Sequence, residues 1–187
     1  GWITGLQLSN MAIQQGATNL PRITRTSGVG LFEYFAHQIL DQQSKGMRDF
    51  LLRTSLLGEF DPTFCETILS RFAPEPQAWS ELINAVLQKN LFAISVGEGE
   101  KWIRYHHLFQ DFLQTVLTQE EPKLVDAIFY RLAETHTDQG EWEKAYHIYL
   151  ELEDFESLGK LVEKAGSSLL QNGRLLTLRS WLDNLPE

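Results

Sequence analysis

The sequence predicts a mainly α-helical protein, in which a winged-helix domain with a small β-hairpin precedes antiparallel helical repeats of tetratricopeptide (TPR) type. Three observations support this fold class. Apolar residues recur at a helical spacing over most of the chain, this spacing changes once to the alternation of β-strands, and a pattern near the end of the chain repeats after about 33 residues.

Four helices are expected before the change of period. Asp61-Pro62 is a favourable helix start, because an aspartate accepts hydrogen bonds from N–H groups of the first turn. Proline is tolerated there, because the N–H that it lacks would have no partner within the helix. The expected helical segments are Leu31–Leu40, Met47–Leu57, Asp61 to near Pro74, and Pro76–Lys89.

Two β-rich runs, Leu91–Val96 and Lys101–Tyr105, flank the glycine-containing loop Gly97–Glu100, which predicts a hairpin. A further helix is expected over Leu108–Leu117. Helices followed by one hairpin and another helix describe a winged-helix domain, which we assign to residues 31–120 with the hairpin as its wing.

Residues 121–187 are predicted to form a TPR-like arm containing the first repeats. Gln139-Gly140 recurs as Asn172-Gly173, close to the TPR period of 34 residues with two antiparallel helices per repeat. Under the same shift, Trp142, Ala145, Tyr149 and Ala133 correspond to Leu175, Leu178, Leu182 and Gly166. The expected helices are Leu124–Asp138, Glu141–Leu152, Phe155–Gln171 and Leu175–Leu182.

The first thirty residues have a different character. Residues 1–15 have loosely helical apolar spacing, whereas residues 16–30 are broken by glycine and proline and are expected to be a linker, since few apolar groups offset the entropy of ordering them. The chain begins at Gly1-Trp2 without an initiator methionine and ends at Leu185-Pro186-Glu187. We therefore expect an interior piece of a longer protein.

Composition limits the function further. The apolar runs are too short to span a bilayer and no charged-then-apolar leader opens the chain, which favours a cytoplasmic protein with no membrane partner. A single cysteine, Cys65, excludes an internal disulfide. The net charge of −9 disfavours direct binding of a nucleic-acid backbone by this part of the protein.

The segment Arg104–Phe109 contains the best candidates for a binding function, because it lies where the hairpin ends and a helix begins. A helix N-terminus favours anions, and histidine can donate to a phosphate oxygen while Arg104 adds positive charge. The alternative is structural: one of His106 and His107 packs on the core and the other caps the helix.

No catalytic residue is predicted. The sequence lacks the phosphate-binding pattern GxxxxGK[ST] and the nucleophile pattern GxSxG, and Cys65 has no neighbouring cue for reactivity. A metal site is not expected, because His37, His136 and His147 lie on separate predicted helices without zinc-ligand spacing. We predict that this chain is not an enzyme.

Several motifs in a fixed order resemble the large LuxR-family, MalT-type transcription regulators of the STAND class of P-loop NTPases. The resemblance covers nearly the whole chain. Its motifs are Gly1-Trp2 with Gly5-Leu6-Gln7-Leu8, Phe50–Leu57, Leu87–Phe92, Arg104–Phe109 with Asp111-Phe112-Leu113, and Trp181–Pro186.

The resemblance implies a layout in which residues 1–15 end a nucleotide-binding module. The partners of this chain would then be an upstream nucleotide-binding domain and downstream helical repeats of the same protein. ATP or ADP with Mg²⁺ is expected in the full-length protein and no cofactor in this fragment. DNA would be bound only by a C-terminal domain outside it, with self-association on activation and at most slow ATP hydrolysis.

In related STAND proteins, the histidine of a Met-His-Asp motif contacts the β-phosphate of ADP. Tyr105-His106-His107 falls on that motif, so the resemblance gives His106 the phosphate-sensing role, with Arg104 and His107 as possible supporting residues. His107 replaces the aspartate of the motif, and Gln7 replaces a proline that packs on adenine.

The expected function is therefore the regulatory interior of an ATP/ADP-switched transcription activator, which couples nucleotide state and inducer sensing to oligomerisation and DNA binding. Two alternatives remain. One is a TPR-like protein-interaction scaffold without a nucleotide link. The other is a DNA-binding winged helix, although its recognition helix over Pro76–Asn90 would offer only Lys89 against Glu81.

Overall fold

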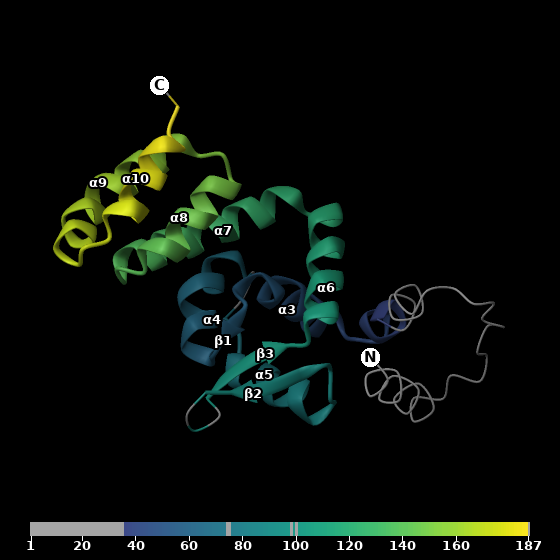
Figure 1. Cartoon of the computed structure of the whole chain (residues 1–187). Coiled ribbons are helices and arrows are strands. Elements are labelled where there is room, and N and C mark those ends of the chain that lie inside the picture. Colours follow the sequence, from purple (N-terminus) through teal and green to yellow (C-terminus); the bar gives the residue numbers. More distant parts are fainter. Residues whose placement is uncertain (1–35, 74–75, 98, 100, 187) are drawn as a thin grey trace, which may run out of the picture.

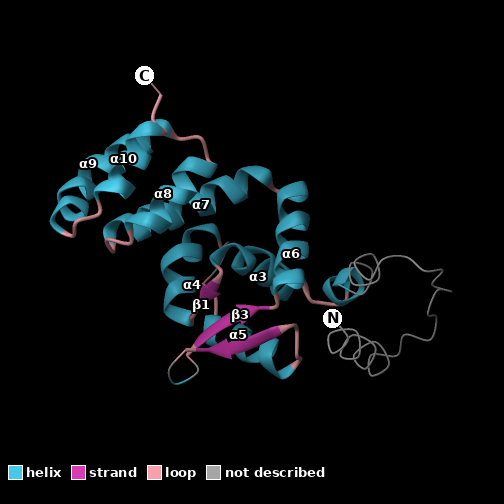
Figure 2. Cartoon of the chain, in the orientation of Figure 1, coloured by secondary structure: helices cyan, strands magenta, loops and turns pink. Residues whose placement is uncertain are grey.

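A computed structural model describes residues 36–73, 76–97, 99 and 101–186 (Figure 1). The predicted end of a preceding module at 1–15, the predicted linker at 16–30 and the first residues of the helix expected from Leu31 lie outside the described residues. Over the described ranges the protein is mainly α-helical with one small antiparallel sheet, which confirms the predicted fold class (Figure 2).

Helices surround the sheet in the first part of the chain, where residues 36–41 are also helical. The elements that follow are α3 (Lys45–Thr54), the 3₁₀ turn η1 (Ser55–Leu57), β1 (Glu59–Phe60), α4 (Pro62–Leu69), the 3₁₀ turn η2 (Ser70–Phe72), α5 (Trp79–Gln88), β2 (Ala93–Val96), β3 (Trp102–Tyr105) and α6 (His107–Glu120).

The start of α4 follows the sequence prediction. Asp61 is the N-cap, its carboxylate accepts a hydrogen bond from the Phe64 N–H at 2.6 Å, and Pro62 occupies the first turn. By contrast, α5 begins at Trp79, three residues after the predicted start at Pro76, and its N-cap Ala78 has no side chain able to accept from the first turn.

The sheet has the strand order β1-β3-β2, with both pairs antiparallel. Val96 pairs with Trp102, so the predicted hairpin is present. Strand β1 was not predicted, because two residues are too few to display an alternating pattern. Along β3, Ile103 and Tyr105 face the core, and Trp102 and Arg104 face outward.

The second part of the chain is a row of helices, each of which packs against the next: α7 (Pro122–Asp138), α8 (Trp142–Glu151), α9 (Phe155–Gln171) and α10 (Leu175–Asp183). In Figure 1, α9 and α10 lie at the end of the molecule far from the sheet.

The turns of these helices repeat with the predicted spacing. Gly140 and Gly173 both adopt a positive φ, of 73° and 70°, in the left-handed conformation that ends many helices. After each glycine, the next N–H donates back to a helix carbonyl at 2.8 Å: Glu141 to His136, and Arg174 to Leu169.

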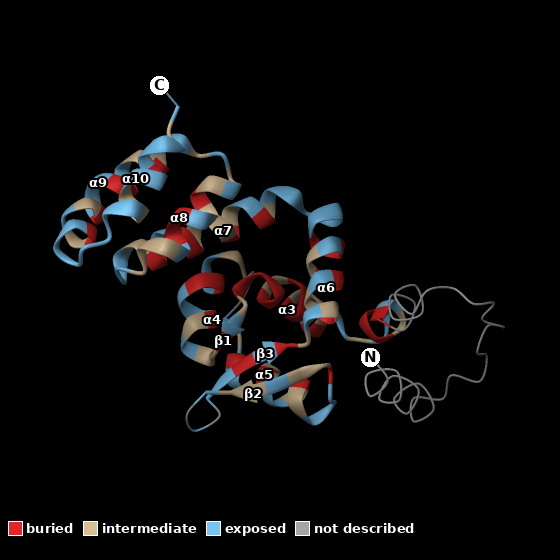
Figure 3. Cartoon of the chain, viewed as in Figure 1, coloured by how far each residue is buried: buried red, intermediate tan, exposed pale blue. Residues whose placement is uncertain are grey.

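The burial of the helices does not repeat in the same way. Tyr149 is buried, whereas its counterpart Leu182 is 52% exposed. Helix α10 packs inward through Trp181, whose ring stacks on Tyr146 with centroids 4.3 Å apart. The opposite face of α10 therefore remains largely exposed (Figure 3). Leu178, which the 33-residue shift matches to buried Ala145, is partly buried against the smaller core.

Two clusters of buried side chains form the core. The larger one joins the sheet, α3–α6 and α7 as far as Leu132. The smaller one begins at Ala133 and joins α7 to α8, α9 and α10. Helix α7 thus belongs to both clusters and links the two parts of the chain. None of the helices in the described ranges is long and apolar enough to cross a membrane.

Candidate functional site

The predicted binding segment lies where β3 leaves the sheet and α6 begins, and Tyr105 anchors it. Its hydroxyl is hydrogen-bonded to Thr54 Oγ1 at 2.8 Å inside the core, and its ring packs against Phe60 and Phe109. Burial raises the pKa of Tyr105 far above its usual range, so the phenol stays neutral. The last residue of β3 is therefore fixed on the core side.

The backbone of His106 is also fixed. Its N–H donates to the Phe92 carbonyl at 2.6 Å, and its own carbonyl accepts from the N–H groups of Phe109 and Gln110 in the first turn of α6. The side chains of Gln110 and Gln114 both donate to the Ser55 carbonyl, at 2.8 and 2.7 Å. These bonds hold the start of α6 against η1.

The side chain of His106 differs from an ordinary helix cap. His106 occupies the N-cap position of α6, yet its imidazole makes no capping hydrogen bond. Its Nδ1 is buried and is the single buried side-chain nitrogen or oxygen in the described residues without a hydrogen-bond partner. Such orphaned groups are uncommon in proteins and cost free energy, so this one calls for a functional explanation.

Electrostatics keep this imidazole neutral. Burial lowers the pKa of His106, and the neighbouring His107 lowers it further. The two rings stack with centroids 4.4 Å apart and an interplanar angle of 29°. A neutral imidazole carries one N–H donor and one acceptor nitrogen, so His106 can still donate one hydrogen bond to an anion.

Of the two possible supporting residues, the structure brings only His107 into contact with His106. His107 is exposed at the first position of α6. Arg104 points to the outer face of the sheet, where its guanidinium pairs with Glu59 at 3.4 Å, with both side chains about half exposed. Glu59 was missed by sequence reasoning, because it lies in the two-residue strand β1.

The described residues give little support for a metal site or a nucleophilic cysteine. No group of three or more His, Cys, Asp or Glu that could hold a metal ion occurs among them. Cys65 is buried, and burial raises the pKa of its thiol to about 12, which leaves it protonated and a poor nucleophile.

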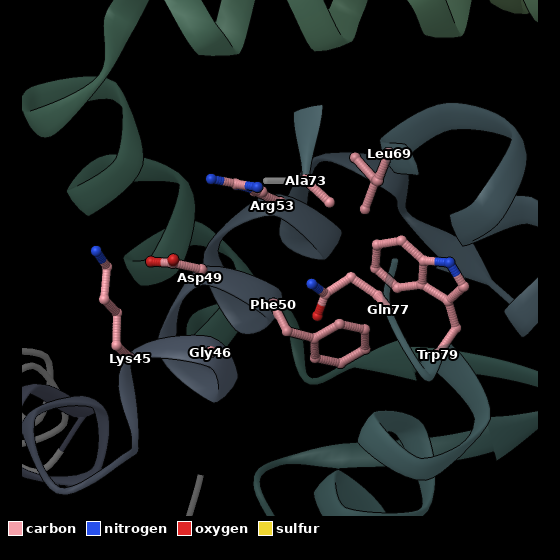
Figure 4. A pocket seen from close by; sticks show the side chains of 9 residues that line it. All are labelled: Lys45, Gly46, Asp49, Phe50, Arg53, Leu69, Ala73, Gln77 and Trp79. Carbon is pink, nitrogen blue, oxygen red and sulfur yellow. The ribbon is translucent and has the colours of Figure 1, made fainter. Parts of the chain in front are cut away.

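A hollow of about 220 Å³ lies away from the predicted site, between α3, the end of α4 and the start of α5 (Figure 4). Phe50, Leu69 and Trp79 give it an apolar lining, and Lys45 and Arg53 lie on the α3 side. Arg53 already donates to the Phe72 carbonyl at 2.8 Å, and none of the residues predicted as functional lines the hollow.

Comparison with known proteins identifies relatives of this chain. Residues 36–125 match the family model of the MalT winged helix domain. The chain is 27% identical over 207 aligned residues to the HTH-type transcriptional regulator MalT of Klebsiella pneumoniae subsp. pneumoniae, and equally to that of Klebsiella pneumoniae strain 342. Each alignment covers 97% of this chain and 22% of the relative, so the chain spans about a fifth of the length of these relatives.

Proposed function

Since this chain belongs to the MalT-type regulators through the winged-helix domain at residues 36–125, we propose that it transmits the state of a bound nucleotide from one domain of the full-length protein to the others. In this proposal, His106 donates a hydrogen bond to a phosphate of ADP held by an upstream domain of the same protein. The contact favours an inactive arrangement of the domains. Its loss, together with inducer sensing by downstream helical repeats, permits self-association and DNA binding by a domain outside this chain.

One observation carries the proposal: the partly exposed imidazole of His106 makes no hydrogen bond within the described part of the chain, although the backbone on both sides of it is held firmly. A residue that only stabilised the fold would be expected to use both ring nitrogens or to cap α6. The unpaired N–H groups at the start of α6 add an environment that favours an anion.

Residues of this chain hold His106 in position. Tyr105 and the His106 N–H fix the end of β3, and the two glutamines of α6 fix the helix start, so little freedom is lost when the imidazole donates. When bound, the nucleotide would supply an anionic phosphate oxygen as acceptor. Because the pKa of His106 is lowered, this begins as a neutral donor, and protonation at lower pH would strengthen the contact.

A hydrogen bond to a charged group contributes about 1.5–3 kcal/mol, which corresponds to a shift of roughly 10- to 150-fold in a two-state equilibrium. We therefore expect His106→Ala, in the full-length protein, to raise uninduced transcription in a reporter assay and to weaken ADP binding by about this factor. His107→Ala and Arg104→Gln should have smaller effects, since one residue is exposed and the other pairs with Glu59.

The matched control is His147→Ala, which removes an exposed histidine from α8. It should leave both readouts unchanged. Normal folding of His106→Ala is verified by circular dichroism and thermal unfolding. Wild-type ADP affinity and wild-type basal transcription in a folded His106→Ala protein would refute the phosphate contact.

A further inference from the structure

A cleft of about 590 Å³ lies between the winged-helix part and the first repeat, on the outer side of the sheet. One wall comes from the end of η1, β1, α4 and β3, and the other from the α7–α8 turn. Residues about 80 positions apart, such as Glu59 and Glu141, therefore line the same space. None of the residues proposed to act with the nucleotide lines it.

The sheet-side wall is aromatic. Trp102 is 38% exposed, and its ring centroid lies 5.9 Å from that of Phe64. Phe64 in turn lies 6.2 Å from the His136 ring on the facing wall. An accessible indole face attracts organic cations through the charge distribution of its π-system.

The facing wall carries a carboxylate. Glu141 Oε2 lies 2.6 Å from His136 Nδ1, and both Glu141 oxygens accept from Lys144 Nζ at 3.0 and 3.1 Å. Burial lowers the pKa of His136, so the imidazole is neutral near pH 7 and the charge of Glu141 is balanced mainly by Lys144. The Lys144 side chain is 62% exposed, so its pairing with Glu141 contributes little to stability.

The second carboxylate of the cleft, that of Glu59, is also paired with a basic side chain. Glu59 pairs with Arg104 at 3.4 Å, a long contact between two half-exposed side chains. Exposed pairs of this kind contribute little to stability and are readily exchanged. Both carboxylates of the cleft are thus paired with cations that a ligand cation can replace at small cost.

We propose that this cleft binds a guanidinium or primary ammonium group on a short apolar stem. The stem would lie against Trp102 and Phe64, and the cation between Glu59 and Glu141, where it displaces Lys144. Two sources share this chemistry: a free organic cation, and an arginine or lysine side chain of another protein segment. Because the walls belong to two parts of the chain, the ligand favours whichever relative position of those parts binds it more tightly.

The proposal is tested by calorimetric titration of the 187-residue chain with n-butylguanidinium. Its neutral isostere n-butylurea is the matched control and should bind at least about tenfold more weakly, because it lacks the charge. Acetyl-Gly-Arg-Gly-amide distinguishes the sources: binding tighter than butylguanidinium indicates a protein side chain, and weaker binding a free cation. Equal affinity for butylguanidinium and butylurea, or binding of neither, overturns the proposal.

Substitutions locate the site. Glu141→Gln and Glu59→Gln should each weaken butylguanidinium binding about tenfold. Lys144→Gln should strengthen it, because it removes the resident competitor. The control Glu156→Gln changes the net charge equally on distant α9, where Glu156 pairs with exposed Lys160, and should have no effect.

General attraction to an acidic protein would strengthen binding after the loss of any lysine, so Lys160→Gln on α9 is the matched control for Lys144→Gln and should leave the affinity unchanged. If Glu141→Gln unfolds the chain, Glu59→Gln and Lys144→Gln still decide the matter. Unaltered affinity in both of these, or a loss with Glu156→Gln equal to that with Glu59→Gln, would exclude the cleft as the binding site.

Discussion

The winged-helix part and the helical repeats are stabilised in different ways. In the first, aromatic rings from different elements meet around Phe109, which contacts the rings of Phe92, Tyr105 and Phe112 with centroids 5.2–6.3 Å apart. In the second, the smaller core combines buried alanines with the stacked pair Tyr146–Trp181, and α10 leaves Leu176 83% exposed. The first part is a closed core that can hold a side chain in an unsatisfied position, whereas the second is a layer with one free face.

The largest predicted loss of stability should follow from making a cavity in the core of the winged-helix part. Phe109 is fully buried, and Phe109→Ala removes its ring contacts and leaves a cavity, so we expect a loss of about 3–5 kcal/mol in the free energy of unfolding. Urea unfolding followed by circular dichroism measures it. Leu176→Ala on the exposed face of α10 is the control and should change stability by less than about 0.5 kcal/mol. Similar losses in the two variants would mean that the two parts do not differ as described.

A smaller effect should distinguish the turns of the repeats from their helix interiors. Gly140→Ala places a Cβ on a residue with φ of 73° and should destabilise the chain by about 1 kcal/mol. Gly166→Ala, within α9, meets no atom within 4 Å and should stabilise it by about 0.5–1 kcal/mol through helix propensity. The two variants differ from wild type by the same methyl group, so thermal unfolding of the pair isolates backbone conformation. Effects of equal sign would show that the positive φ imposes no constraint.

Local signals in the sequence were enough to predict most of the fold. The N-cap at Asp61, the hairpin around Gly97–Glu100 and the recurrence of glycine at 140 and 173 each depend on residues close in sequence, and all three are present. The match of residues 36–125 to a MalT winged helix domain agrees with the family resemblance of the same motifs.

What the sequence could not supply depends on contacts between distant residues. Strand β1 exists because Glu59 and Phe60 pair with β3, about 45 residues later, and two residues alone show no period. The 33-residue shift does not predict that Leu182 is exposed, because burial depends on which helices pack over a face. Sequence identified His106 as a candidate through the order of motifs, but its orphaned Nδ1 and the cleft beside Trp102 required the fold.

The smallest predicted effect is a dependence of the free energy of unfolding on pH. It involves one histidine from each part of the chain. Burial lowers the folded-state pKa of both His106 and His136, so the unfolded chain binds more protons near the ordinary histidine pKa of about 6.5. The free energy of unfolding should therefore decline modestly as pH falls from 7 to 5. The pKa values of Glu120, Glu141 and Asp154 are also lowered, but the stability that they contribute is lost at more acidic pH, below the ordinary pKa of a carboxyl group.

His106→Gln and His136→Gln should each flatten the decline in urea titrations at pH 5, 6 and 7. The two histidines differ in one respect: Glu141 supports the protonated form of His136, and no carboxylate is hydrogen-bonded to His106 within the described ranges. Glu141→Gln should consequently lower the pKa of His136 further and leave that of His106 unchanged, as measured by NMR titration of the ring protons. A His136 pKa that rises in Glu141→Gln, or a slope that neither glutamine variant alters, would contradict this account of the two sites.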